Sequence, residues 1–86
     1  RQERPAGSQK LRFSYKEQRE FETIDGDIAA LEGEITAVKA EQEKCASDYV
    51  ALQDLQERQA ALEARLEEKL ERWVYLNDLA ERIAGQ

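Results

Sequence analysis

The chain has 86 residues and a net charge of −6, and more than half of its residues are Ala, Glu, Lys, Leu or Arg. This composition is typical of long helices and coiled coils, in a chain long enough for one small domain. The sequence has no His, one Cys and no Gly-rich phosphate loop, which excludes imidazole catalysis, the usual zinc-ligand sets and a nucleotide site. We expect acidic pairs such as Glu67 and Glu68 to lie on solvated faces, so we predict no enzyme active site, no metal and no cofactor in these residues.

Residues 1–13 are expected to form a basic, flexible linker in front of a helical domain at residues 14–86. A Pro, a Gly and a Ser lie within the first nine residues, which have no apolar periodicity. Residues 1–20 carry six basic and three acidic side chains, whereas residues 21–86 carry seven basic and sixteen acidic ones. A polyanion would therefore be repelled by most of the chain and tolerated only near its start.

The first helix is expected over about residues 14–46. Ser14 and Glu17 have the spacing of a capping box, in which each side chain accepts a hydrogen bond from the backbone N–H of the other residue. Residues with spacings that alternate between three and four then form a seam, the pattern of a helix packed along another helix. This first seam consists of Phe21, Ile24, Ile28, Leu31, Ile35, Val38, Gln42 and Cys45. At such a position Cys45 is expected to act as a small core side chain.

A second seam follows, out of phase with the first. It consists of Leu52, Leu55, Gln59, Leu62, Leu66, Lys69, Trp73, Leu76, Ala80 and Ile83. The phase breaks between Cys45 and Leu52, which predicts a turn at about residues 47–49 and a second helix at about residues 50–84. Ser47 or Asp48 can cap the start of this helix, and a Gly follows its predicted end. We therefore predict an all-α fold, a monomeric antiparallel two-helix coiled-coil hairpin.

The register of the hairpin has two candidates. The shortest workable turn places Ile24 opposite Trp73, whereas a register that is looser by one heptad places Leu31 opposite Trp73. We favour the tighter register. Gln42 and Gln59 are polar seam residues in neighbouring layers of that register, and either they fix the register at some cost in stability or these layers are already hydrated.

Basic side chains from both ends of the chain meet at one end of such a hairpin. The candidate nucleic-acid contacts are Lys10, Arg12, Lys16, Arg19, Arg72 and Arg82. Tyr15, Trp73 and Tyr75 are nearby in sequence, and basic side chains interleaved with aromatic ones can bind phosphates and stack on bases. Acidic side chains share this end of the hairpin and weaken the prediction.

A second surface feature is a row of small residues on the outer face of the first helix. Gly26, Gly33 and Ala40 recur every seven residues. Each Gly costs a helix roughly 1 kcal/mol relative to Ala. The row either lets the backbone of a protein partner approach closely or is a tolerated surface feature.

Two strings give the chain a resemblance to a known family. Lys10–Glu22, which reads KLRFSYKEQREFE, and Glu71–Leu76, which reads ERWVYL, resemble the start and end of the C-terminal coiled-coil domain of Uup-type ABC-F ATPases. The resemblance covers about Lys10–Leu79. The chain departs from the family in its short connection, Ser47–Tyr49, where the family usually has a longer one that contains Asp-Pro, and in its strongly acidic body.

The resemblance implies a cytoplasmic bacterial protein without a membrane domain, in which this module follows two cassettes that bind ATP and Mg. The chain does not begin with Met and is expected to be a piece of that larger protein. ABC-F proteins act at the ribosome, and this domain is associated with DNA binding in Uup-type members. The resemblance thus implies nucleic-acid contacts at Lys10, Arg12, Lys16, Arg19 and Arg72. The alternative is a protein-interaction or spacer arm that contacts the parent cassettes or the ribosome without binding nucleic acid itself.

Overall fold

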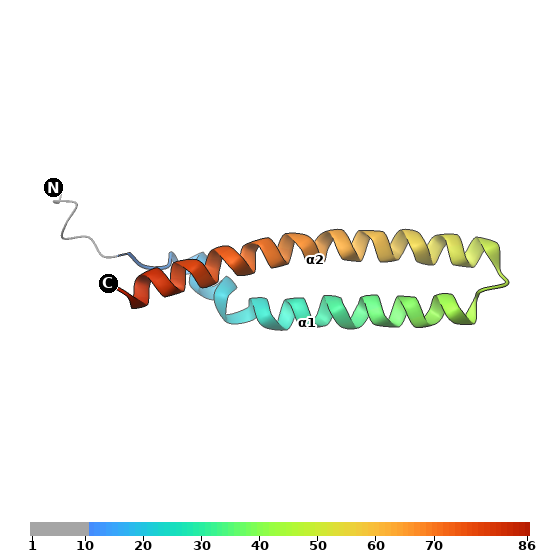
Figure 1. Cartoon of the computed structure of the whole chain (residues 1–86), viewed down its shortest axis with the longest axis horizontal. Helices are drawn as coiled ribbons and strands as arrows, with labels where there is room; N and C mark the ends of the chain where they lie inside the picture. The colour runs from blue at the N-terminus through green and yellow to red at the C-terminus, as the bar shows by residue number, and fades with distance from the viewer. Residues whose placement is uncertain (1–10) are drawn as a thin grey trace.

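The computed structural model describes residues 11–86, which form two long helices packed side by side (Figure 1). Helix α1 spans Tyr15–Lys44 and helix α2 spans Tyr49–Ala84. The helices run in opposite directions, so the start of α1 and the end of α2 lie together at one end, which we call the root. The turn between the helices forms the other end, the tip. The predicted all-α hairpin is confirmed; residues 1–10, with Lys10 and most of the predicted linker, lie outside the described residues.

The starts of both helices are fixed by side-chain caps. The Ser14 hydroxyl accepts from the Glu17 N–H at 3.1 Å, and the Glu17 carboxylate accepts from the Ser14 N–H at 2.9 Å, which confirms the capping box. Helix α1 ends at Lys44, two residues before the predicted end, because the backbone leaves helical geometry at Cys45, with φ −105° and ψ 22°. Of the two candidate caps for α2, Asp48 is the one used, and its carboxylate accepts from the Ala51 N–H at 3.2 Å.

The core is a ribbon of seam residues between the helices. Six side chains of the two seams are buried: Ile24, Leu31, Ile35, Val38, Leu62 and Leu76. The other seam residues are partly buried, except Trp73, which is 38% exposed. Full burial of an aliphatic side chain stabilises a protein by roughly 1.5–3 kcal/mol, so this ribbon is the main source of stability in the hairpin.

Contacts across the hairpin agree with the tighter of the two registers. The Trp73 indole N–H donates to the carboxylate of Asp25, the neighbour of Ile24, at 2.9 Å. Nearer the tip, the Gln42 side-chain amide donates to the Gln59 carbonyl oxygen at 2.6 Å. This hydrogen bond joins the two neighbouring polar layers of the core, and the register-fixing role of the glutamines stays a prediction.

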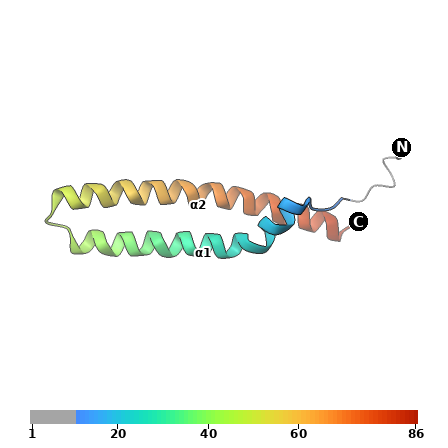
Figure 2. The ribbon, with the colours of Figure 1, turned by 180° about the vertical axis from the view of Figure 1, so that it is seen from behind.

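Helix α1 is bent near its start. Figures 1 and 2 show its first turns lying across the end of α2 before the helix turns and runs alongside α2. Near this bend the Thr23 hydroxyl donates to the carbonyl oxygens of Arg19 at 3.3 Å and Glu20 at 3.4 Å. A side-chain hydroxyl that competes for helix carbonyls is a known cause of bending. The heptad pattern did not predict this bend.

Neither α1 nor α2 is a candidate for a membrane-spanning helix. Among residues 11–86, no helix combines the length and the apolar character that crossing a membrane requires.

Candidate nucleic-acid interface at the root

Three of the predicted nucleic-acid contacts lie exposed at the start of α1. Lys16 and Arg19 are three residues apart and so share a face of the helix, and Arg12 lies just before the helix begins. No carboxylate of residues 11–86 lies within 4.0 Å of a charged nitrogen of these three side chains. We call Arg12, Lys16 and Arg19 the cationic face. Within residues 11–86, their charges are therefore not balanced by an ion pair.

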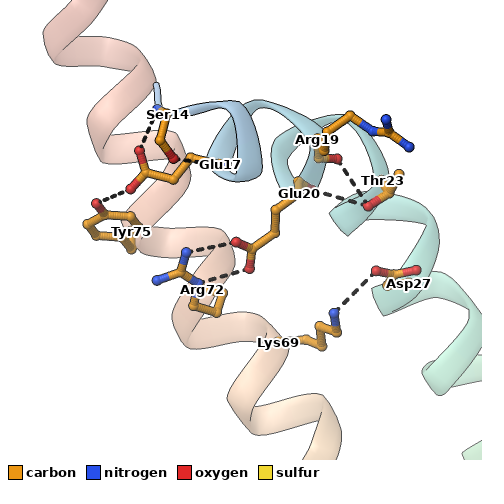
Figure 3. Close-up of polar contacts among 9 residues, drawn as sticks. All are labelled: Ser14, Glu17, Arg19, Glu20, Thr23, Asp27, Lys69, Arg72 and Tyr75. Carbon is orange, nitrogen blue, oxygen red and sulfur yellow. Dashed lines mark hydrogen bonds and ion pairs between the residues drawn. The ribbon is translucent and has the colours of Figure 1, made fainter. Parts of the chain in front are cut away.

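An exposed aromatic ring lies beside the cationic face. Tyr15 is 75% exposed, and its hydroxyl accepts a hydrogen bond from the Arg19 guanidinium at 2.9 Å. The guanidinium carbon of Arg19 lies 5.8 Å from the centre of the Tyr15 ring, within the range of a cation–π contact. Tyr15 is not a carboxylate, so this contact does not balance the charge of Arg19, and Figure 3 shows the Arg19 side chain pointing away from α2.

Arg72 has a different environment, since it faces α1. Its guanidinium donates twice to the carboxylate of Glu20, at 2.7 and 2.9 Å, in a bidentate ion pair (Figure 3). The hydrogen bonds from Arg72 lower the pKa of Glu20, and the same contact raises the pKa of Arg72. The charge of Arg72 is thus balanced within the hairpin, where it ties α2 to the first turns of α1.

A second cross-helix contact anchors the same turns. The Tyr75 hydroxyl donates to the Glu17 carboxylate at 2.6 Å, while the other oxygen of that carboxylate completes the cap at Ser14 (Figure 3). The backbone hydrogen bond from Ser14, followed by the bond from Tyr75, lowers the pKa of Glu17. The bond to Glu17 raises the pKa of Tyr75. The Glu17 carboxylate therefore both caps the start of α1 and attaches α1 to α2.

Arg82 is also at the root but is paired within its own helix. Its guanidinium lies 3.1 Å from the Asp78 carboxylate, and both side chains are mostly exposed. Close by, the side chain of Gln86 both donates to and accepts from the backbone of Leu11, at 2.7 and 2.6 Å. The structure thus gathers five of the six predicted contacts at one end, three without and two with a carboxylate partner among the described residues.

A groove beside the root lacks the excess of positive charge that the cationic face has. It has a volume of about 490 Å³ and is lined by side chains of both signs, with Lys69 and Asp27 paired across it at 3.2 Å. Its charges thus balance, and it indicates no particular ligand. In residues 11–86 no group of three His, Cys, Asp or Glu side chains is placed to hold a metal ion.

The cross-helix ion pair was missed by sequence reasoning although a signal for it existed. Acidic side chains recur every seven residues on α1, at Glu20, Asp27, Glu34 and Glu41. Basic side chains recur every seven residues on α2, at Arg58, Arg65 and Arg72. Such flanking positions meet across an antiparallel pair, so these two rows predict that Arg72 faces a carboxylate.

Comparison with known proteins gives one match. The model of a family described as the ABC transporter C-terminal domain matches residues 12–78, a range that includes the cationic face and most of both helices. That family is a small helical domain and not a catalytic cassette. No curated protein and no solved structure matches the chain.

Proposed function

Because the chain belongs to the ABC transporter C-terminal domain family, we propose that it is an accessory arm of an ABC ATPase and that this arm binds nucleic acid at its root. The strings Lys10–Glu22 and Glu71–Leu76 favour a parent of the Uup type, a cytoplasmic ABC-F ATPase that binds ATP and Mg in its cassettes. Such a parent places the arm near DNA or ribosomal RNA. The arm contributes binding, and the cassettes contribute ATP hydrolysis.

The observation that carries this proposal is the cationic face. Arg12, Lys16 and Arg19 have no carboxylate partner among the described residues, and Tyr15 beside them is open to solvent. Lys and Arg side chains neutralise phosphates and release counterions, and an exposed aromatic ring can stack on an unpaired base. The acidic body of the hairpin repels the same ligand, so contact is confined to the root.

The remaining predicted contacts are given unequal roles in this proposal. Lys10 lies outside the described residues and stays a predicted contact. Arg82 shares its charge with Asp78 and contributes weakly. Arg72 is paired with Glu20, and we assign it to holding the root together and not to phosphate contact.

Charge-removal variants test the proposal. The variant R12Q/K16Q/R19Q removes the cationic face, and the control K39Q/K44Q/R58Q removes three exposed cations from the body of the hairpin. Both lose the same net charge. We expect the first variant to weaken binding of labelled duplex DNA, single-stranded DNA or structured RNA at least tenfold in low salt, and the control to bind like the wild type. Equal losses in both variants, or no binding by the wild type, would exclude a specific cationic face.

A second candidate function is a protein contact through the small residues of α1. A Cβ atom placed on Gly26 or Gly33 would meet no atom outside its own helix within 4 Å, so the packing of the hairpin does not require either glycine. Close approach of a partner backbone to this face of α1, for instance from the parent cassettes, would require both glycines. The variant G26K/G33K should then abolish co-purification with the cassettes and leave nucleic-acid binding intact. The opposite pattern would exclude this candidate.

A further inference from the structure

Three large apolar side chains lie exposed on α2, next to the root. Leu70 is 42% exposed, Trp73 is 38% exposed and Val74 is 59% exposed. Their spacing of three and four residues places them on one side of the helix. Leu70 and Val74 lie outside the seam, and the residues seven positions before and after each of them are polar. We call Leu70, Trp73 and Val74 the apolar island.

The apolar island is surrounded by carboxylates. The helix neighbours of Leu70 and Val74, at three, four and seven residues, include five acidic side chains and no basic one. The surrounding acidic residues are Glu63, Glu67, Glu71, Asp78 and Glu81. From α1, the Asp25 carboxylate reaches the edge of the island, where it accepts from the Trp73 indole N–H. Of the nearby cations on α2, Lys69 and Arg72 pair with carboxylates of α1, and Arg82 pairs with Asp78, so four of the five acidic side chains have no basic partner among the described residues.

We propose that the apolar island docks a basic amphipathic helix of a protein partner. Apolar side chains of the partner would cover Leu70, Trp73 and Val74, and its Lys and Arg side chains would meet the surrounding carboxylates. Anchors at spacings of three and four residues form a ridge of the kind that packs along a second helix. Trp73 has the aromatic character of residues that dominate such interfaces.

The acidic residues around the apolar island favour one kind of binding partner over the others. A second copy of the chain would bring the same acidic surround and a net charge of −6, so like charges would face each other. A nucleic acid or an anionic membrane would be repelled for the same reason. A protein helix with basic side chains around an apolar stripe is complementary in both respects. This inference does not depend on nucleic-acid binding at the cationic face, which uses other residues.

A designed peptide serves as the probe. An 18-residue Leu/Lys peptide with its leucines on one helical face is titrated into the hairpin, with a scrambled peptide of the same composition and a Leu/Glu counterpart as comparisons. Trp73 is the single Trp of the chain, so its emission reports contact at the island. We expect the amphipathic Leu/Lys peptide to bind at least tenfold more tightly than either comparison. Absence of binding, or equal binding of the scrambled peptide, would overturn the proposal.

Variants place the contact on the island. L70Q/V74Q should weaken binding of the Leu/Lys peptide at least tenfold, whereas Y49Q/V50Q, which removes two exposed apolar side chains at the tip, should leave it unchanged. If L70Q/V74Q loses helicity in circular dichroism, E67Q/E71Q gives an equivalent test, because neither residue belongs to a seam. That variant should weaken binding severalfold and reduce its salt dependence. Equal effects of island and tip variants would contradict the proposal.

Discussion

At the scale of single residues, two carboxylates at the start of α1 hold the root together. Glu17 completes the cap at Ser14 and accepts from Tyr75, and Glu20 accepts two hydrogen bonds from Arg72. These bonds join the bent first turns of α1 to α2, close to the buried seam residues Ile24 and Leu76. The cationic face is carried by the same turns, so its position depends on these two carboxylates.

The root should therefore lose stability at both extremes of pH. The pKa values of Glu17 and Glu20 are lowered in the folded hairpin, so their contribution is present above the unfolded value of 4.5 and is lost as pH falls through the folded values. The pKa of Tyr75 is raised, so its contribution is present below the unfolded value of 10.0 and is lost as pH rises through the folded value. Amide exchange at residues 15–20 should be slowest, after correction for the intrinsic pH dependence, between about pH 5 and pH 9.

Matched variants isolate these groups from the other carboxylates of the chain. E17Q/E20Q should lack the additional acid-side loss of protection at residues 15–20, and Y75F should lack the alkaline-side loss. A wild-type pH profile in E17Q/E20Q would show that these two carboxylates do not hold the root.

At the scale of helices, the seams and the caps were predictable because each follows a local rule. The heptad spacing located the buried side chains, and the Ser14 and Glu17 pair located the start of α1 to within one residue. The bend of α1 was not predictable in this way, since a repeat of seven describes the average face of a helix and not its path. The exposure of Trp73, a seam residue, was missed together with the bend.

The candidate site was predictable only in part. The basic residues near both ends of the sequence were predicted to meet at the root, because an antiparallel hairpin brings its two ends together. Which of these cations lack a carboxylate partner among the described residues depends on side-chain geometry, which pairs Arg72 with Glu20 and places Arg19 beside Tyr15. The Tyr75 to Glu17 bond had no periodic signal at all, because the two residues meet only where α1 crosses α2.

The two glycines of α1 give a stability prediction. Gly26 and Gly33 lie within the helix, and a Cβ atom on either would meet open space. Gly26→Ala and Gly33→Ala should each raise the free energy of unfolding by about 1 kcal/mol, because Ala loses less backbone entropy in a helix. Urea unfolding followed by circular dichroism measures this. A loss of stability in either variant would mean that the glycine has a structural role that the hairpin does not reveal.

The paired glutamines give a second prediction for the helices. Replacing both Gln42 and Gln59 with Leu exchanges one partly buried hydrogen bond for apolar contact. The double variant should be more stable by about 1–2 kcal/mol but less specific in register or oligomeric state. Thermal unfolding measures the stability, and analytical ultracentrifugation measures the oligomeric state. A less stable double variant that remains a single monomeric species would contradict the register-fixing role.

At the scale of the whole molecule, the two surfaces proposed to bind partners lie at or next to one end of the hairpin. Helix α2 alone, with 36 residues, is about 54 Å long at 1.5 Å per residue. The cationic face lies at and just before the start of α1 and the apolar island lies on α2, so the two proposals use separate surfaces. The acidic body between root and tip keeps polyanions away from the rest of the arm.

The salt dependence of nucleic-acid binding tests this account most directly. If the cationic face neutralises three phosphates of duplex DNA, the slope of log K against log salt is about −2.7, from −0.9 for each phosphate. The wild-type hairpin should show a slope at least this steep, since Lys10 is also a predicted contact, and R12Q/K16Q/R19Q should bind more weakly with a slope that is shallower by about 2.7. Affinity that does not fall as salt rises, or a triple variant that keeps the wild-type slope, would contradict the claim that the root of the arm binds nucleic acid.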